Sequence, residues 1–364
     1  MPPIPTPSMD AAAQSDQRHT FLNAFRNVYL QDMDPEERRP IAVIAGASGF
    51  VGRAAAEAFT ADGYRLRVIG RRTGIPWSDA DGIRAAVDGA DIVLNLAGKS
   101  VDCRYTDRNR REILDSRVRT TDALRAAIAA ADRPPRVWLN ASTATIYRHE
   151  MQRPNTESAG TIGTGFSVDV ATSWERAFFA GSLPGTRRAA LRMAIVIGDG
   201  PATRMLLALA RSGLGGTQSD GWCPPHRRYR GIGEHPTGPD RAPWYRTHGH
   251  QRFSWIHLDD VVRAIRFIRD DERLEGPINL AAAHPSDNRS LMRTLRRTAG
   301  TPFGLPVRRW MLEVGMWALR SEAELLMKSR WVEPEALTTA GFTFAHPDLE
   351  AALLDARDRI RRPA

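Results

Sequence analysis

Short apolar runs alternate with longer amphipathic segments through most of this chain. The predicted strands are Ile41–Ala45, Arg65–Ile69, Asp91–Leu96, Arg136–Ala141 and Ala189–Ile197. Between them, Ala54–Ala61 has the composition of a helix, and Ile113, Leu124 and Ile128 recur on one face of a longer one. Strands that alternate with helices at this spacing predict βαβ units and therefore an α/β fold with a parallel sheet.

The pattern changes at both ends of the chain and at one internal segment. Residues 1–39 form a predicted N-terminal extension, whose one helix would pack on its own body or on a second subunit of a homodimer. Residues 40–300 form the main domain, interrupted at about 217–252 by a stretch rich in Gly, Pro, His and Arg, and 301–364 form a small helical C-terminal domain. Leu258–Ile268 is a predicted helix capped by Asp259 or Asp260. The predicted tail helices are Arg308–Leu319, Ser321–Ser329 and Asp348–Ile360, the last with Pro347 as its N1 residue.

Composition narrows the class of protein. An apolar content of 42% supports a sizeable core, and no run approaches the 18 apolar residues of a membrane span. The start of the chain lacks the features of a secretory signal, and two cysteines cannot build a disulfide framework, so we expect a cytoplasmic protein with no membrane association. The net charge of +9 is spread along the chain; Arg108, Arg110 and Arg111 alternate with acids, which favours a solvated helix face over a nucleic-acid stripe.

A glycine triplet follows the first predicted strand. Gly46, Gly49 and Gly52 stand directly before a predicted helix. Glycines let the backbone turn sharply and approach a pyrophosphate, while free N–H groups at a helix N-terminus attract its negative charge. The spacing therefore indicates a dinucleotide site of the G-x-x-G-x-x-G type, with a tight turn that binds nothing as the alternative.

The end of the second predicted strand discriminates between cofactors. A site for NAD commonly has an acidic residue there, which holds the 2′-hydroxyl of the adenosine ribose. This strand instead ends in Gly70-Arg71-Arg72. Two guanidinium groups suit a 2′-phosphate, so the sequence predicts NADP(H) rather than NAD(H).

Several motifs together carry a family resemblance over about residues 40–350. Gly46–Gly52, Asn95-Leu-Ala-Gly98 and Ser142-Thr-Ala-Thr-Ile-Tyr147 resemble the landmarks of extended short-chain dehydrogenases/reductases. Further motifs resemble one subgroup of these enzymes, the NAD-dependent epimerase/dehydratase-like (sugar-nucleotide-epimerase-like) family, whose members end in a small uncharacterised C-terminal domain. They are Ile113-Leu-Asp-Ser-Arg117, Gly213-Leu-Gly-Gly216, Phe253–Asp260, Leu305-Pro306 and Ala340–Phe344.

The resemblance implies a doubly wound Rossmann-type parallel sheet with a smaller substrate region in the C-terminal half. The cofactor residues it implies, together with the glycines and arginines above, are Ser48, Phe50, Val51, Asn95, Ala97 and Gly98. Thr143 matches the family's catalytic Ser/Thr position. We expect an oxidoreductase or epimerase that acts on a small molecule, with a cofactor-binding regulatory or scaffold protein without turnover as the alternative.

The proton relay of short-chain dehydrogenases is absent. None of the six tyrosines has a lysine four residues later, and on the helix that the resemblance identifies, Ser167 and Ala171 occupy the tyrosine and lysine positions. Tyrosine and lysine normally share one helix face, where the cation lowers the tyrosine pKa. Lys99 and Tyr147 are the candidate substitutes, with an exposed lysine at a strand end and a core tyrosine whose hydroxyl lies at the surface as the alternatives.

The segment at 220–248 resembles an insertion that is aromatic and basic. It suits a lid over an anionic substrate, a subunit contact or, third, a single-strand nucleic-acid surface. Its cysteine and histidines, with neighbouring His248, His250 and His257, lack the spacing of a zinc site, so we expect no metal, and His257 is expected to be structural.

Overall fold

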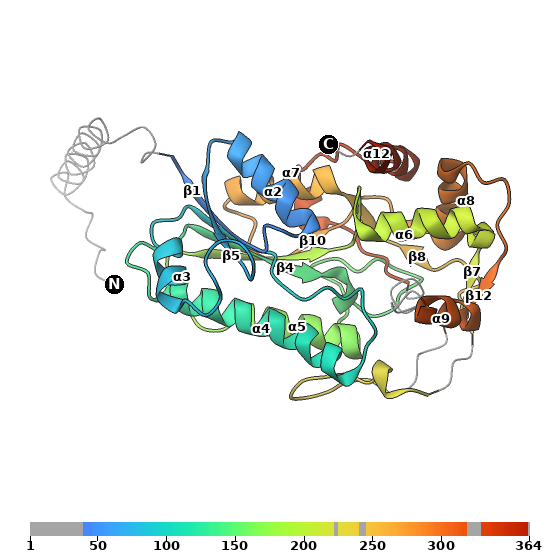
Figure 1. Ribbon diagram of the computed structural model, residues 1–364, viewed down its shortest axis with the longest axis horizontal. Coiled ribbons are helices and arrows are strands. Elements are labelled where there is room, and N and C mark those ends of the chain that lie inside the picture. The colour runs from blue at the N-terminus through green and yellow to red at the C-terminus, as the bar shows by residue number, and fades with distance from the viewer. Residues whose placement is uncertain (1–38, 222–224, 240–244, 319–328, 363–364) are drawn as a thin grey trace, which may run out of the picture.

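The computed structural model describes residues 39–221, 225–239, 245–318 and 329–362 (Figure 1). The predicted N-terminal extension therefore lies outside the described residues, except for Arg39. Cys223 and nearly all of the helix predicted at Ser321–Ser329 also lie outside them.

A six-stranded sheet, parallel throughout, forms the centre of the fold. Its strand order is β10-β5-β4-β3-β1-β2, so the winding direction reverses between β1 and β3. The strands are β1 Ile41–Ala45, β2 Arg65–Ile69, β3 Ile92–Asn95, β4 Val137–Thr143, β5 Arg187–Met193 and β10 Gly276–Leu280. This confirms the predicted doubly wound, Rossmann-type arrangement, in which ligands bind outside the carboxyl ends of the strands at the reversal.

Helices cover both faces of the sheet, which explains why the central strand β1 is apolar throughout. Ala42 and Ile44 pack into one core cluster, against α2, α7 and α11, whereas Val43 and Ala45 pack into a second, against α3, α4 and α5 (Figure 1). The helix bounds are α2 Phe50–Ala61, α3 Ala80–Val87, α4 Asp107–Ala129, α5 Phe166–Phe179, α7 Leu258–Asp270 and α11 Glu335–Thr339. α5 is the helix that the resemblance identified.

The C-terminal half adds a third core beside the sheet. Its helices are α6 Pro201–Leu209, α8 Asn288–Ala299 and α12 Leu349–Arg361. The two-stranded pairs are β6 Ile195–Ile197 with β9 Trp255–His257, β7 Gln218–Ser219 with β12 Val307–Arg308, and β8 Arg252–Phe253 with β11 Ser286–Asp287. The remaining elements are α9 Arg309–Ala318 and the short helices η1 Ala144–Ile146, η2 Ala210–Leu214 and η3 Arg227–Tyr229. Within the described ranges, no helix has the length and hydropathy needed to cross a membrane.

Three local predictions are wrong. The strand predicted at Ala189–Ile197 is two strands, because β6 leaves the central sheet and pairs with β9. α7 is capped by the side chain of His257, which accepts from the N–H of Asp259, so neither aspartate is the cap. Likewise Asp348 caps α12, and Pro347 precedes that cap instead of occupying N1.

Candidate functional site

The glycine turn between β1 and α2 leaves no room for side chains. Gly46 has a φ of +86°, and a Cβ there would lie 2.8 Å from the carbonyl carbon of Leu96. A Cβ on Gly52 would lie 2.2 Å from the Gly46 carbonyl oxygen. Gly49, the N-cap of α2, offers no capping side chain. The first N–H groups of α2 therefore remain available to an anion at the reversal point of the sheet.

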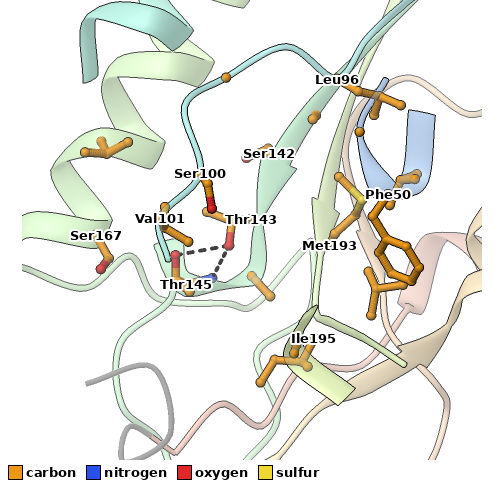
Figure 2. Close-up of a pocket in the computed structure, with 18 of the residues that line it drawn as sticks. Phe50, Leu96, Ser100, Val101, Ser142, Thr143, Thr145, Ser167, Met193 and Ile195 are labelled. Carbon is orange, nitrogen blue, oxygen red and sulfur yellow. Dashed lines mark hydrogen bonds between the residues drawn. The ribbon is translucent and has the colours of Figure 1, made fainter. Parts of the chain in front are cut away.

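A cavity of about 520 Å³ opens from this turn (Figure 2). On the cofactor side it is lined by Gly46, Gly49, Phe50, Val51, Gly52, Ala97, Gly98 and Lys99. On the other side it is lined by Thr143 at the end of β4, Thr145 of η1, Ser167 and Trp174 of α5, and Ile195, Met205, Ser254 and Arg330 of the C-terminal half. One continuous space therefore joins the glycine turn to hydroxyl groups and to a substrate-sized region.

The charge of this cavity has one sign. Its charged lining residues within the described chain are Lys99, Arg117 and Arg330, with no aspartate or glutamate. The Nζ of Lys99 lies 2.6 Å from Oε2 of Glu112 on α4. Hydrogen bonds from Lys99 and Arg108 lower the pKa of Glu112 to about 2, so Lys99 already has a charged partner. The cavity favours anionic ligands.

The hydroxyl groups at the end of β4 have different roles. Ser142 donates its hydroxyl hydrogen to Oε1 of Glu175 at 2.6 Å, so toward the cavity its oxygen can only accept a hydrogen bond. Oγ1 of Thr143 accepts from the N–H of Thr145 at 3.2 Å and shares a second hydrogen bond, at 3.1 Å, with Oγ1 of Thr145 (Figure 2). When Thr145 donates in that second bond, the hydrogen of Thr143 is left for a ligand in the cavity. Ser167 of α5 also lines the cavity, whereas Ala171 is buried. These three hydroxyls can hold a substrate oxygen, but α5 brings no cation to them.

Tyr147 does not fit the expected relay role. Its side chain is fully buried and outside the cavity lining. Its hydroxyl donates to Oδ1 of Asn279 at 2.9 Å and accepts from Nη1 of Arg192 at 2.8 Å. Desolvation raises its pKa above the ordinary value. Tyr147 is therefore a core tyrosine, and its hydroxyl is buried rather than at the surface.

A buried ion pair that the sequence analysis missed lies beside it. The guanidinium of Arg192 on β5 donates twice to Glu175 of α5, with Nε to Oε1 at 2.8 Å and Nη2 to Oε2 at 2.7 Å. Together with Ser142, Tyr147 and Asn279 this pair forms one chain of hydrogen bonds beneath the cavity. It ties the ends of β4, β5 and β10 to α5.

Four predicted cofactor residues lie outside the cavity lining. Asn95 is buried in the core, where its Nδ2 donates to Asn140 at 2.7 Å and its Oδ1 accepts from the N–H of Ala97 at 3.1 Å. Its amide shapes the turn that the cofactor would contact. Ser48 is exposed at the glycine turn. Arg71 and Arg72 are exposed after β2, beside the point where the N–H of Gly46 donates to the carbonyl of Ile69.

The described part of the insertion joins the two halves of the molecule. Arg110 of α4 donates to the carbonyls of Arg227 and Gly231, and Asp169 of α5 accepts from the N–H groups of Ile232 and Thr237. On the opposite side, the hydroxyl of Tyr229 donates to Glu313 of α9 at 3.0 Å. The segment therefore spans from the N-terminal ends of α4 and α5 to the C-terminal region.

The histidines of this segment do not converge. In the parts of the chain that are described, one group has metal-ligand geometry: His257, Asp259 and His346. Arg359 already donates twice to Asp259, at 2.9 and 2.6 Å. A divalent cation would have to compete with that guanidinium, and the ring of His257 already accepts from the N–H of Asp259 as the cap of α7.

A glycine turn at the reversal point of a doubly wound parallel sheet defines a Rossmann-type, dinucleotide-binding fold. Residues 42–168 match the NAD-dependent epimerase/dehydratase family, and residues 309–356 match DUF1731, a domain of unknown function. The chain is therefore similar to this epimerase family over residues 42–168 and to that domain over residues 309–356.

Relatives resemble the chain over most of its length, and solved structures share its fold. Epimerase family protein ML0860 of Mycobacterium leprae is 29% identical over 335 residues, which cover 90% of this chain and 99% of the relative. YfhF of Bacillus subtilis is 26% identical, over 85% of this chain and 95% of the relative. The crystal structure of human SDR39U1 (isoform 2) with NADPH has a TM-score of 0.72 at 24% identity, over 87% of this chain and 99% of that one. The crystal structure of Thermus thermophilus UDP-glucose 4-epimerase with NAD has a TM-score of 0.63 at 14% identity, and the match covers 89% of this chain and 100% of that one.

Proposed function

We propose that the chain binds NADP(H) in the cavity and acts as an oxidoreductase or epimerase on a small anionic or hydroxylated molecule. The observation that carries this proposal is the continuous space from the glycine turn to the hydroxyls of Thr143 and Ser167. The turn fits a pyrophosphate because it leaves the first N–H groups of α2 open to an anion, and a Cβ at Gly46 or Gly52 would clash with the backbone that shapes it. The NADPH in the human SDR39U1 structure supports the same ligand.

The preference for NADP(H) rests on Arg71 and Arg72. Neither forms an ion pair with a described residue, and both are exposed where β2 ends next to the glycine turn. A 2′-phosphate there would gain charge-assisted hydrogen bonds that the 2′-hydroxyl of NAD cannot make. The double variant R71A/R72A should bind NADPH at least about tenfold more weakly and NADH almost unchanged. A wild-type chain that binds NADH as tightly as NADPH would contradict the preference.

Within the cavity, the chain's own groups would bind and orient the substrate. The bound nicotinamide supplies hydride exchange. Thr143 can donate to a substrate oxygen, Ser142 can accept, and the apolar wall of Val170, Ile195 and Met205 excludes water. Substitution T143V should lower substrate-dependent turnover of NADP(H) without weakening NADPH binding.

A cofactor-loaded regulatory or scaffold protein without turnover is the second candidate function. The burial of Tyr147 and the absence of a tyrosine–lysine pair on α5 favour it. The two functions differ in one result. Oxidation or reduction of NADP(H) that depends on a small molecule, for example one that co-purifies with the protein, supports the enzyme. Tight cofactor binding with no substrate-dependent rate across such molecules supports the scaffold.

A further inference from the structure

Arg117 of α4 is held in an unusual place beside the cavity. Its guanidinium carbon lies 5.0 Å from the centre of the Trp174 ring, and a Cβ on Gly98 would lie 3.3 Å from that carbon. The guanidinium is therefore bounded by an indole and by the backbone after β3. It also lines the cavity.

The hydrogen bonds of Arg117 use only part of its donors. Nη1 donates to the carbonyls of Lys99 and Ile113, both at 3.0 Å. No described residue accepts from its Nε or Nη2, and no described carboxylate forms an ion pair with it. Lys99, by contrast, has Glu112. Arg117 thus brings a positive charge to the cavity that no described acid compensates.

Desolvation disfavours the charged form of Arg117 but does not neutralise it. Desolvation lowers the pKa of Arg117 to about 10, so the guanidinium remains protonated at neutral pH. A desolvated charge without a counter-charge is costly, and an oxyanion that accepts from its remaining donors would offset that cost. Its planar edge suits a phosphate or a pair of ribose oxygens.

The position of Arg117 indicates which ligand provides those oxygens. Gly98 follows Ala97, whose backbone nitrogen would lie 2.9 Å from a Cβ on Gly46. The guanidinium therefore stands between the backbone next to the glycine turn and Trp174 of α5. Trp174 lies one helical turn beyond Ala171, the position where the short-chain dehydrogenase pattern has its lysine. Arg330 and Ser254 line the cavity from the C-terminal half instead.

We propose that Arg117 binds the nicotinamide half of the dinucleotide, through its phosphate or ribose oxygens, and so replaces the cation that α5 lacks. This inference rests on the proposed binding of NADP(H). It assigns Arg117 the orienting role of the missing lysine. It does not assign the second role, lowering a tyrosine pKa, because Ser167 stands where that tyrosine would be.

The test compares a whole cofactor with a fragment that lacks the nicotinamide half. NADPH and adenosine 2′,5′-bisphosphate are titrated by calorimetry into the wild type, R117M, R117K and R119M. Arg119 lies on the same helix and is exposed, so R119M is matched in charge and substitution. We expect R117M to weaken NADPH binding at least about tenfold, because the variant loses charge-assisted hydrogen bonds to the nicotinamide half. The affinity for the fragment should change less than about twofold, because the fragment has no nicotinamide half.

R117K keeps the charge but loses the planar fork, so its loss of NADPH affinity should be smaller than that of R117M. R119M should bind both ligands like the wild type. NADPH affinity unchanged in R117M would overturn the proposal and reassign the guanidinium to an anion of the substrate. A parallel loss of both ligands would also overturn it, since it would indicate a structural role. Equal affinity of the wild type for the fragment and for NADPH would also overturn the proposed role of Arg117. A wild type that binds neither ligand would instead refute the proposed function itself.

Discussion

Removal of one member of the buried Glu175–Arg192 pair should destabilise the protein more than removal of both. Each side chain is about one-tenth exposed, and the two share two short hydrogen bonds. In R192M the carboxylate of Glu175 keeps only the hydroxyl of Ser142, and in E175M the guanidinium keeps only Tyr147. Loss of one partner from such a buried pair costs about 3–5 kcal/mol of unfolding free energy.

The double variant E175M/R192M should behave differently, because no buried charge remains. Two methionines fill a similar volume, and the remaining cost comes from the hydroxyls of Ser142 and Tyr147, each of which loses one hydrogen bond. At about 1 kcal/mol for each hydroxyl, the double variant should lose about 1–3 kcal/mol. Simple addition of the two single losses would give about 6 kcal/mol or more.

Equilibrium unfolding in urea, followed by tryptophan fluorescence on the wild type and the three variants, measures this double-mutant cycle. A double variant less destabilised than either single variant supports the pair as a charge-compensated unit. Losses that add would refute the reasoning, because they would mean that Glu175 and Arg192 contribute independently.

Three further predictions concern other groups of the fold. Y147F should lower the unfolding free energy by about 1–3 kcal/mol, because Arg192 and Asn279 each lose a buried partner, and it should leave NADPH affinity unchanged. Weaker NADPH binding with unchanged stability would instead indicate that Tyr147 takes part in the binding site. The pKa of His257 lies below its ordinary 6.5 because desolvation, followed by the charge of His346, disfavours protonation. The unfolded chain therefore binds more protons below about pH 6.5, and stability should fall as the pH decreases from there; H257N, which keeps an acceptor for the N–H of Asp259, should flatten this slope, and an unchanged slope would exclude His257 as its source. D169N should accelerate tryptic cleavage at Arg227–Arg230, because the carboxylate of Asp169 anchors Ile232 and Thr237; a cleavage rate equal to that of the wild type would contradict this role. A segment that closes over the cavity should be cleaved more slowly when NADPH is bound, and a wild-type cleavage rate that NADPH does not change would contradict such closure.

The apolar patterning of the chain was sufficient for most of the central sheet. β1 and β2 have the predicted bounds, because each is a short apolar or alternating run between clear turns. β10 was not predicted, because it begins with Gly276 and Pro277, residues that are uncommon inside strands. It forms an edge of the sheet, where proline is tolerated. The division between β5 and β6 depends on pairing with β9, which lies far along the chain.

The candidate site was only partly predictable, because a motif does not specify which way a side chain points. Thr143 and the glycine turn reach the cavity, whereas Asn95 and Tyr147 from equally strong motifs face the core. One signal was available for Arg192: a charged residue inside the apolar run Ala189–Met193 requires a buried partner. Arg117 stood in a motif that the resemblance used, but its exposure to the cavity follows from contacts with Gly98 and Trp174 that only the fold creates.

The central claim is that the glycine turn and the first N–H groups of α2 bind a phosphorylated dinucleotide. Calorimetric titration of NADPH into the wild-type chain tests it most directly. We predict saturable binding of one NADPH per chain, tighter than that of NADH. Absence of measurable heat, together with an unfolding temperature that NADPH does not raise, would contradict the account.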